Sequence, residues 1–111
     1  MPDETARIVL TTAGSTDEAT RIAHALVDRR LAACVNLIPG VTSVYSWQGA
    51  IETAHEVLML IKTSEEKLPE LETALREMHS YQVPEFVVLA VESGNKAYLD
   101  WLLMAVATTS P

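Results

Sequence analysis

Four side chains in this sequence could ligate a soft or borderline metal ion: Cys34, His24, His55 and His79. Zinc and copper prefer such thiolate and imidazole ligands, but no two of the four have the spacing of a sequence-encoded metal site. His79 is the strongest candidate, because it stands in a loop with Tyr81 and Glu85, where side chains can gather around a ligand. Its alternative role is a structural hydrogen bond. The other two histidines are expected on the surface.

The sequence gives little support for a catalytic nucleophile or a phosphate-binding loop. Cys34 follows two alanines inside a predicted strand, which favours a buried structural thiol over a reactive one, and no serine lies in a GxSxG elbow. Residues 12–15 precede a predicted helix and could hold an anion, yet Asp17 and Glu18 already place negative charge in its first turn. The sequence therefore predicts a protein that is not an enzyme and has no catalytic residue.

The net charge limits the kinds of binding partner to expect, and the cysteine content indicates the cellular compartment. The net charge is −7, with 15 acidic and 8 basic residues. Nucleic acid is an unsuitable partner, since binding its backbone needs a positive surface, whereas an acidic surface favours divalent cations or simply solubility. A single cysteine excludes an internal disulfide, residues 1–4 lack a signal-peptide pattern, and no apolar run could span a bilayer. We expect a cytoplasmic protein without membrane association.

The first third of the chain predicts a strand followed by a helix. The 111 residues, 49% of them hydrophobic, suit one domain covering residues 1–111. Residues 7–12 have strand character and end in a small-residue turn. Ser15 and Glu18 form a capping box. The helix that follows should bury one apolar stripe: Ala19, Ile22, Ala23, Leu26 and Val27.

An unusually long hairpin, residues 34–62, occupies the middle of the chain. Residues 32–47 form its first arm, with a bulge at Pro39-Gly40, and residues 51–62 return after a tight turn at Gln48-Gly49. Each arm of about 13 residues is about 43 Å long, whereas a globule of this size is about 34 Å across. The tip must overhang the body and expose Tyr45 and Trp47, which predicts burial against another subunit.

The remaining residues predict two helices and one strand. Thr63 or Ser64 should cap the second helix, which has Pro69 in its first turn and an apolar stripe of Leu68, Leu71, Leu75 and Met78. After the loop at residues 79–85, residues 86–91 form a continuous apolar strand suited to the centre of a sheet. Asn95 caps the third helix, whose apolar side comprises Tyr98, Leu99, Leu102, Leu103 and Val106. Residues 108–111 are expected to fray.

This order of elements predicts an α+β fold of the ferredoxin-like, split-βαβ class. Strand, helix, two strands, helix and strand, with one extra C-terminal helix, give a four-stranded antiparallel sheet backed by helices. The long hairpin joins the second and third strands.

Three sequence segments together resemble the CutA divalent-cation tolerance family. They are LAACVNLIPG at residues 31–40, SVYSWQG at residues 43–49 and HSYQVPE at residues 79–85. The resemblance runs through nearly the whole chain in order. It implies a homotrimer of ferredoxin-like subunits, similar to the PII signalling proteins, and binding of copper or other divalent ions in metal tolerance.

The resemblance also implies site residues. His79 and Cys34 match family positions and are the expected metal ligands, whereas Thr11 and Met78 replace a cysteine and a histidine that some members carry. Thr11 is a weak ligand for a soft ion. The residues implied at clefts between subunits are Trp47, Glu56, Lys62, Tyr81 and Glu85. They either stitch the trimer together or bind a small polar ligand, which would make the protein a PII-like signalling module.

Overall fold

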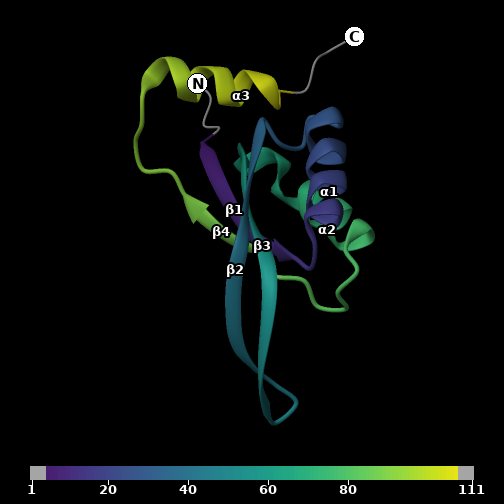
Figure 1. The fold of residues 1–111 in the computed structure, drawn as a ribbon. Helices are drawn as coiled ribbons and strands as arrows, with labels where there is room; N and C mark the ends of the chain where they lie inside the picture. The colour runs from purple at the N-terminus through teal and green to yellow at the C-terminus, as the bar shows by residue number, and fades with distance from the viewer. Residues whose placement is uncertain (1–4, 108–111) are drawn as a thin grey trace.

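The computed structural model describes residues 5–107, in which three helices pack around one four-stranded sheet (Figure 1). The elements in chain order are β1 (Ala6–Ala13), α1 (Thr16–Asp28), β2 (Cys34–Trp47), β3 (Ala50–Ser64), the 3-10 turn η1 (Glu65–Lys67), α2 (Leu68–Met78), β4 (Val87–Ala90) and α3 (Lys96–Ala105). The strand order is β2-β3-β1-β4 with antiparallel neighbours, which confirms the predicted fold class. The tail predicted at residues 108–111 lies outside the described residues.

Helix α1 begins at the predicted Ser15 cap and buries most of its predicted stripe, but the capping box is only half formed, because the Glu18 carboxylate binds Ser80 instead. The Glu18 backbone N–H donates to Ser15 Oγ at 3.1 Å, which satisfies one of the free donors at the helix start. The first four apolar positions are buried in the core, but the prediction for Val27 was wrong, because this side chain is 43% exposed. It comes one position after Leu26 and is therefore rotated by about 100° from the buried stripe. No helix in residues 5–107 is long and apolar enough to cross a membrane.

Only one face of the sheet is covered by α1 and α2 (Figure 1). Val9 and Ile61 lie opposite each other on that face and are fully buried in the core. Because strand side chains alternate, their neighbours point to the other face. We call this second surface the open face, defined by Ile8, Leu10, Ile38, Leu58 and Leu60. Helix α3 crosses only the end of the sheet far from the hairpin tip.

The hairpin of β2 and β3 has the predicted bulge, turn and overhang. Ile38 pairs with Leu58 and Val41 with Glu56, so Pro39 and Gly40 stand opposite one residue, and Gly40 has φ 79°. At the tip, Gln48 and Gly49 have φ 51° and 84°, as a type I′ turn requires. The principal extents are 48 × 29 × 22 Å, and Figure 1 shows the tip projecting from the body.

The predicted cap of the second helix was wrong for α2 itself, although Ser64 is the N-cap residue of the 3-10 turn that leads into it and makes no side-chain capping bond there. Ser64 still belongs to β3, where it pairs with Ala6, and α2 starts only at Leu68 after the 3-10 turn. The Thr63 hydroxyl is buried and donates to the Leu31 carbonyl at 2.8 Å, so it is not free to cap a helix. The position of Pro69 in the first turn was correct.

The predicted central position of the last strand was also wrong. β4 covers only Val87–Ala90 and pairs with β1 at the edge of the sheet, where Val87, Val88 and Leu89 are exposed. An apolar run indicates burial without saying against which partner. In α3, Leu102 and Val106 are buried, but Tyr98 of the predicted apolar side is 41% exposed.

Candidate functional site

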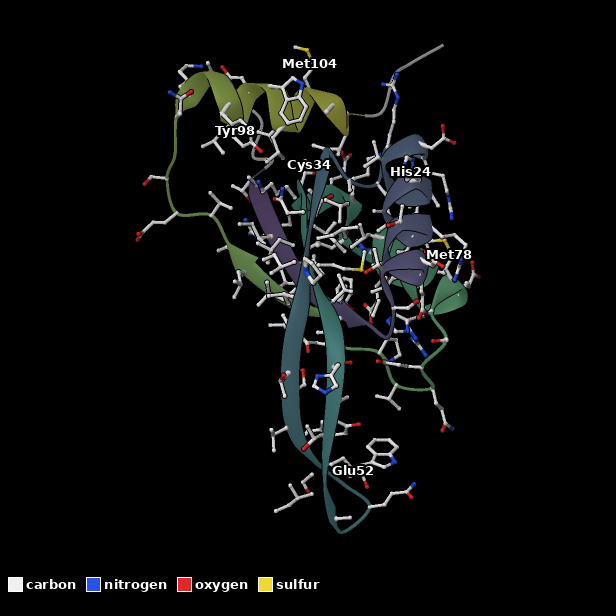
Figure 2. The ribbon with its side chains drawn as sticks, viewed as in Figure 1. His24, Cys34, Glu52, Met78, Tyr98 and Met104 are labelled. Carbon is white, nitrogen blue, oxygen red and sulfur yellow. The ribbon has the colours of Figure 1, made fainter. Side chains whose placement is uncertain are left out.

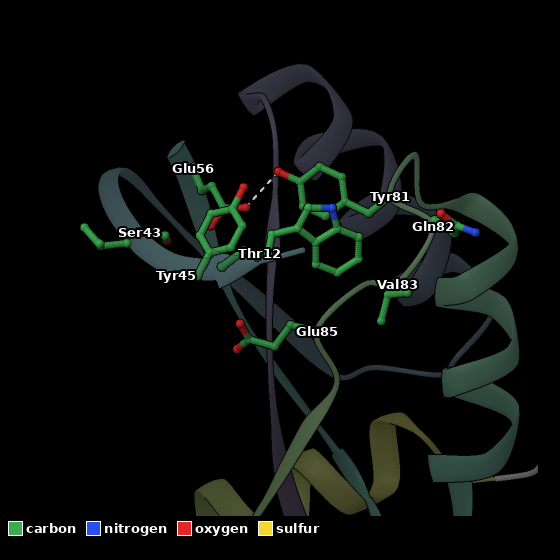
Figure 3. Close-up of a pocket in the computed structure, with 10 residues that line it drawn as sticks. Thr12, Ser43, Tyr45, Glu56, Tyr81, Gln82, Val83 and Glu85 are labelled. Atoms are coloured by element: carbon green, nitrogen blue, oxygen red, sulfur yellow. Dashed lines mark hydrogen bonds between the residues drawn. The ribbon is translucent and has the colours of Figure 1, made fainter. Parts of the chain in front are cut away.

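A cavity of about 670 Å³ lies between the hairpin and the loop that follows α2 (Figure 3). The hairpin contributes four residues of β2 and one glutamate of β3, while the loop folds back over them. The lining residues are Thr12, Ser43, Val44, Tyr45, Trp47, Glu56, Tyr81, Gln82, Val83 and Glu85. Four of the five residues that the resemblance assigned to a cleft therefore meet within a single chain.

Glu56 is the first acid of the cavity and accepts several hydrogen bonds. The Tyr81 hydroxyl donates to Glu56 Oε2 at 2.7 Å, as Figure 3 shows. Burial raises the pKa of Glu56, but hydrogen bonds from Ser43, Tyr81 and Thr12 outweigh it, and the pKa is lowered overall. The carboxyl is thus ionised at neutral pH. The pKa of Tyr81 is raised by burial and by this hydrogen bond, so the phenol keeps its proton.

Glu85 is the second acid of the cavity and has the opposite environment. Partial burial raises its pKa, and the negative charge of Glu56 raises it further. Within residues 5–107, no side chain donates a hydrogen bond or forms an ion pair with this carboxylate. Two carboxylates of one cavity repel each other, so a cation bound between them would stabilise both in the ionised form.

His79 positions the loop that carries Tyr81. Its side chain is fully buried, Nε2 donates to the Thr12 carbonyl at 2.7 Å, and Nδ1 accepts the Tyr81 backbone N–H at 3.0 Å. Both ring nitrogens are therefore engaged, as in the alternative structural role. A metal ion could bind His79 only by displacing one of these bonds, so its role as a ligand stays a prediction.

Glu18 of α1 anchors the same loop. Its carboxylate accepts hydrogen bonds from the Ser80 backbone N–H at 2.8 Å and from Ser80 Oγ at 3.0 Å, and it lies 3.6 Å from His79 Nδ1. Burial raises the pKa of Glu18, but these bonds and the nearby imidazole lower it overall. Gly14 leaves space for the tyrosine, since a Cβ there would lie 3.3 Å from the Tyr81 hydroxyl.

Lys62 and Cys34 lie elsewhere. They stand opposite each other on β3 and β2, near the end of the sheet that α3 crosses (Figure 2). Lys62 Nζ donates to the Tyr98 hydroxyl at 3.4 Å and lies 5.7 Å from the centroid of that ring. Cys34 is half-buried. One chain therefore does not bring Lys62 into the cavity or Cys34 to His79.

The described residues contain no ready metal cage. No group of three or more His, Cys, Asp or Glu side chains in residues 5–107 could hold an ion. His24 and His55 are exposed, as predicted. Thr11 is fully buried, and its hydroxyl has no partner within this part of the chain.

Sequence reasoning missed two hydroxyl groups of the site, those of Thr12 and Ser43, and assigned Tyr45 only to a subunit contact. The period of two in residues 43, 45 and 47 was an available signal, because it puts these side chains on one face of β2. Nothing in the local sequence pairs Thr12 with Glu56, which lies on another strand.

Comparisons with known proteins agree with one another. The family described as CutA1 divalent ion tolerance protein matches residues 7–105. The divalent-cation tolerance protein CutA of Thermus thermophilus is 48% identical over 95 residues, 86% of this chain and 92% of that protein. The protein CutA of Homo sapiens is 49% identical over 83% of this chain, which spans about half (51%) of that relative.

Solved structures give the same picture. The divalent cation tolerance protein of T. thermophilus superposes with a TM-score of 0.89 at 46% identity, covering 90% of this chain and 97% of that one. CutA1 of Oryza sativa superposes with a TM-score of 0.91 at 36% identity, covering 95% and 96%. The periplasmic protein CutA of Archaeoglobus fulgidus reaches 0.89 at 40% identity, covering 92% and 99%.

Proposed function

Because this chain belongs to the CutA1 family of divalent ion tolerance proteins, we propose that it binds divalent cations in metal tolerance, copper most tightly, and that it works as a homotrimer. The observation that carries this proposal is the acidic cavity. Glu56 and Glu85 face one space, and its lining in the described residues includes no lysine, arginine or histidine. A cavity of this charge attracts cations and repels anions.

The donor set supports a site of modest affinity for a divalent ion, because one chain offers mainly oxygen donors. Within one chain, an ion would meet two carboxylates and the hydroxyls around them, with water or a second subunit completing its shell. Copper is favoured because the affinity of nitrogen and oxygen sites for divalent metals peaks at Cu²⁺. His79 and Cys34 remain proposed ligands that would need rearrangement or a second copy of the chain.

The homotrimer is supported by surfaces that the single chain leaves uncovered. The open face, the edge strand β4 and the hairpin tip all carry exposed apolar side chains, among them Leu89, Tyr45 and Trp47. Apolar surface of this extent indicates association. The proposal assigns no catalytic step to the chain and keeps the cytoplasm as its compartment, in line with its single cysteine.

Calorimetric titration with Cu(II) and Zn(II) tests the metal site. We expect the double substitution Glu56→Gln and Glu85→Gln to weaken Cu(II) binding at least about tenfold, because it removes both charges from the cavity. The double substitution Glu70→Gln and Glu72→Gln is the matched control, since it removes two exposed charges from α2. Equal affinity in both double variants would refute the acidic cavity as the site.

Two further variants test the ligands inferred from the resemblance. If Cys34→Ser loses Cu(II) binding while the cavity variants keep it, the metal site lies at Cys34 on the open face and not in the cavity. The stability of His79→Ala without metal shows whether any loss of Cu(II) binding comes from a missing metal ligand or from a destabilised fold.

A second candidate, a PII-like module for a small molecule, is favoured by the size of the cavity. Its volume of about 670 Å³ lies within the range of about 300–1,000 Å³ that is typical of small-molecule sites and far exceeds one ion.

A further inference from the structure

Three aromatic rings share the cavity with the two glutamates. Tyr45 and Trp47 come from β2 and Tyr81 from the opposing loop. Figure 3 shows the Tyr81 hydroxyl pointing to the Glu56 carboxylate, which overlaps the ring of Tyr45 in this view. Tyr45 is near enough to contribute to the raised pKa of Tyr81. The cavity therefore combines three aromatic rings with the carboxylates of Glu56 and Glu85.

Aromatic walls and carboxylates attract the same kind of ligand. The face of an aromatic ring carries a negative quadrupole and attracts ammonium groups within about 6 Å, most strongly when they are desolvated. An anion would be repelled by Glu56, and a neutral molecule would leave the Glu85 carboxylate without a partner in the described structure. An organic cation satisfies both the rings and the acids.

We propose that the cavity binds an organic ammonium ion, with its charge between Glu56 and Glu85 and its alkyl groups against Tyr45, Trp47 and Tyr81. This inference rests on the cation preference proposed above for the same cavity. An ammonium ion needs no inner shell of three or more ligands, which the described residues do not gather. Its alkyl groups use the volume and the apolar walls that a bare metal ion leaves empty.

The two tryptophans of the chain provide a direct reporter and a matched control. Trp47 lines the cavity and is 45% exposed, while Trp101 lies on α3, away from the cavity, and is 49% exposed. Since the chain has only these two, Trp101→Phe leaves Trp47 as the sole indole. Its fluorescence can then be followed during titration of the full oligomer.

The titration uses tetramethylammonium and choline as probes at low salt. The uncharged isostere of choline, 3,3-dimethylbutan-1-ol, has the same shape without the charge. We expect a saturable change in Trp47 fluorescence with both cations and none with the alcohol. An equal response to choline and the alcohol, or no response to either cation, would overturn the proposal.

Substitutions then assign the response to the residues. By calorimetry, we expect Trp47→Leu to weaken choline binding about tenfold and Glu85→Gln about fivefold, with Trp101→Leu unchanged. Equal losses in Trp47→Leu and Trp101→Leu would also overturn it. Melting curves of each variant confirm that the fold is intact.

The same samples separate this inference from the proposed metal site. Cu(II) should compete with choline, because both need the two carboxylates. If the protein binds Cu(II) but not choline, the ammonium site is refuted and the metal site still stands. Choline binding without Cu(II) binding sinks the metal site and leaves the ammonium site supported.

Discussion

At the scale of single residues, hydrogen bonds determine which groups are free to bind a ligand. His79 uses both ring nitrogens to hold the loop, and Glu56 accepts bonds from three hydroxyls. Glu85 has no such partners within the described residues and therefore carries the charge that a ligand can still neutralise. The site thus combines Glu56, which hydrogen bonds hold in place, with Glu85, whose carboxylate has no such bonds within the described residues.

Replacing His79 tests whether its role is structural. His79→Ala should lower the free energy of unfolding of the metal-free protein by about 2–4 kcal/mol, because it opens a cavity and leaves the Thr12 carbonyl and the Tyr81 N–H unpaired. Chemical denaturation measures this, with exposed His24→Ala as the control, expected within about 0.5 kcal/mol of wild type. Unchanged stability together with lost Cu(II) binding would instead identify His79 as a metal ligand.

Glu85 should make the stability depend on pH. Its pKa is raised in the fold, so the fold is favoured when the carboxyl is protonated and loses stability as the pH rises above the usual value of 4.5. Glu85→Gln should therefore raise the melting temperature at pH 7. The gain in the free energy of unfolding should be at most about 0.5 kcal/mol, because solvent screens the group. Below pH 4 this gain should vanish. A gain that is the same at both pH values would contradict the raised pKa.

At the scale of elements, the hairpin depends on two glycines in the left-handed region. Gly40 has φ 79° in the bulge and Gly49 has φ 84° in the turn. The bulge lets β2 keep pairing with β3 beyond Ile38, so that Ser43 and Glu56 can meet in the cavity. The element thus builds the site as well as the overhang.

Substitution of Gly40 tests this dependence. Gly40→Ala should destabilise the protein by about 1–2 kcal/mol, because a Cβ is unfavourable at positive φ. Gly40→Asn should cost less, since asparagine visits this region more readily. Space is not the cause, since a Cβ at Gly40 meets nothing within 4 Å. Equal unfolding free energies for the two variants by denaturant titration would refute the backbone explanation.

At the scale of the whole molecule, residues 5–107 leave one face of the sheet uncovered. α1 and α2 bury one side, while the open face and the edge strand β4 expose apolar residues. The same surface would be buried in the proposed homotrimer, in which Tyr45 and Trp47 would line the cavity at its border with a neighbouring subunit. Light scattering should give about 37 kDa, three times the 12.2 kDa of one chain.

A charge placed on this surface should dissociate the oligomer. Leu89→Lys on β4 should shift the mass toward one chain, because burying an unpaired charge costs several kcal/mol. Val27→Lys is the control, since Val27 is 43% exposed and Leu89 45%, yet Val27 lies on α1, on the covered side of the sheet. If both variants keep the wild-type mass, β4 is not an interface.

Elements that depend on neighbours along the chain could be predicted from the residues alone. Apolar periodicity located α1 and α2, Pro39-Gly40 marked the bulge and Gln48-Gly49 the turn, because these signals act over a few residues. The resemblance named four residues of the cavity. Neither predicted that the pKa of Glu56 is lowered and that of Glu85 raised.

Contacts between distant residues could be learned only from the folded chain. His79 and Thr12 are 67 positions apart, and Tyr81 and Glu56 are 25 apart, so their hydrogen bonds exist only once strand, helix and loop have packed together. The edge position of β4 has the same origin, since an apolar strand records that it will be buried but not which chain will bury it. The physical reason is that pairing and burial are properties of the assembled fold, whereas turns and periodicity belong to the local backbone.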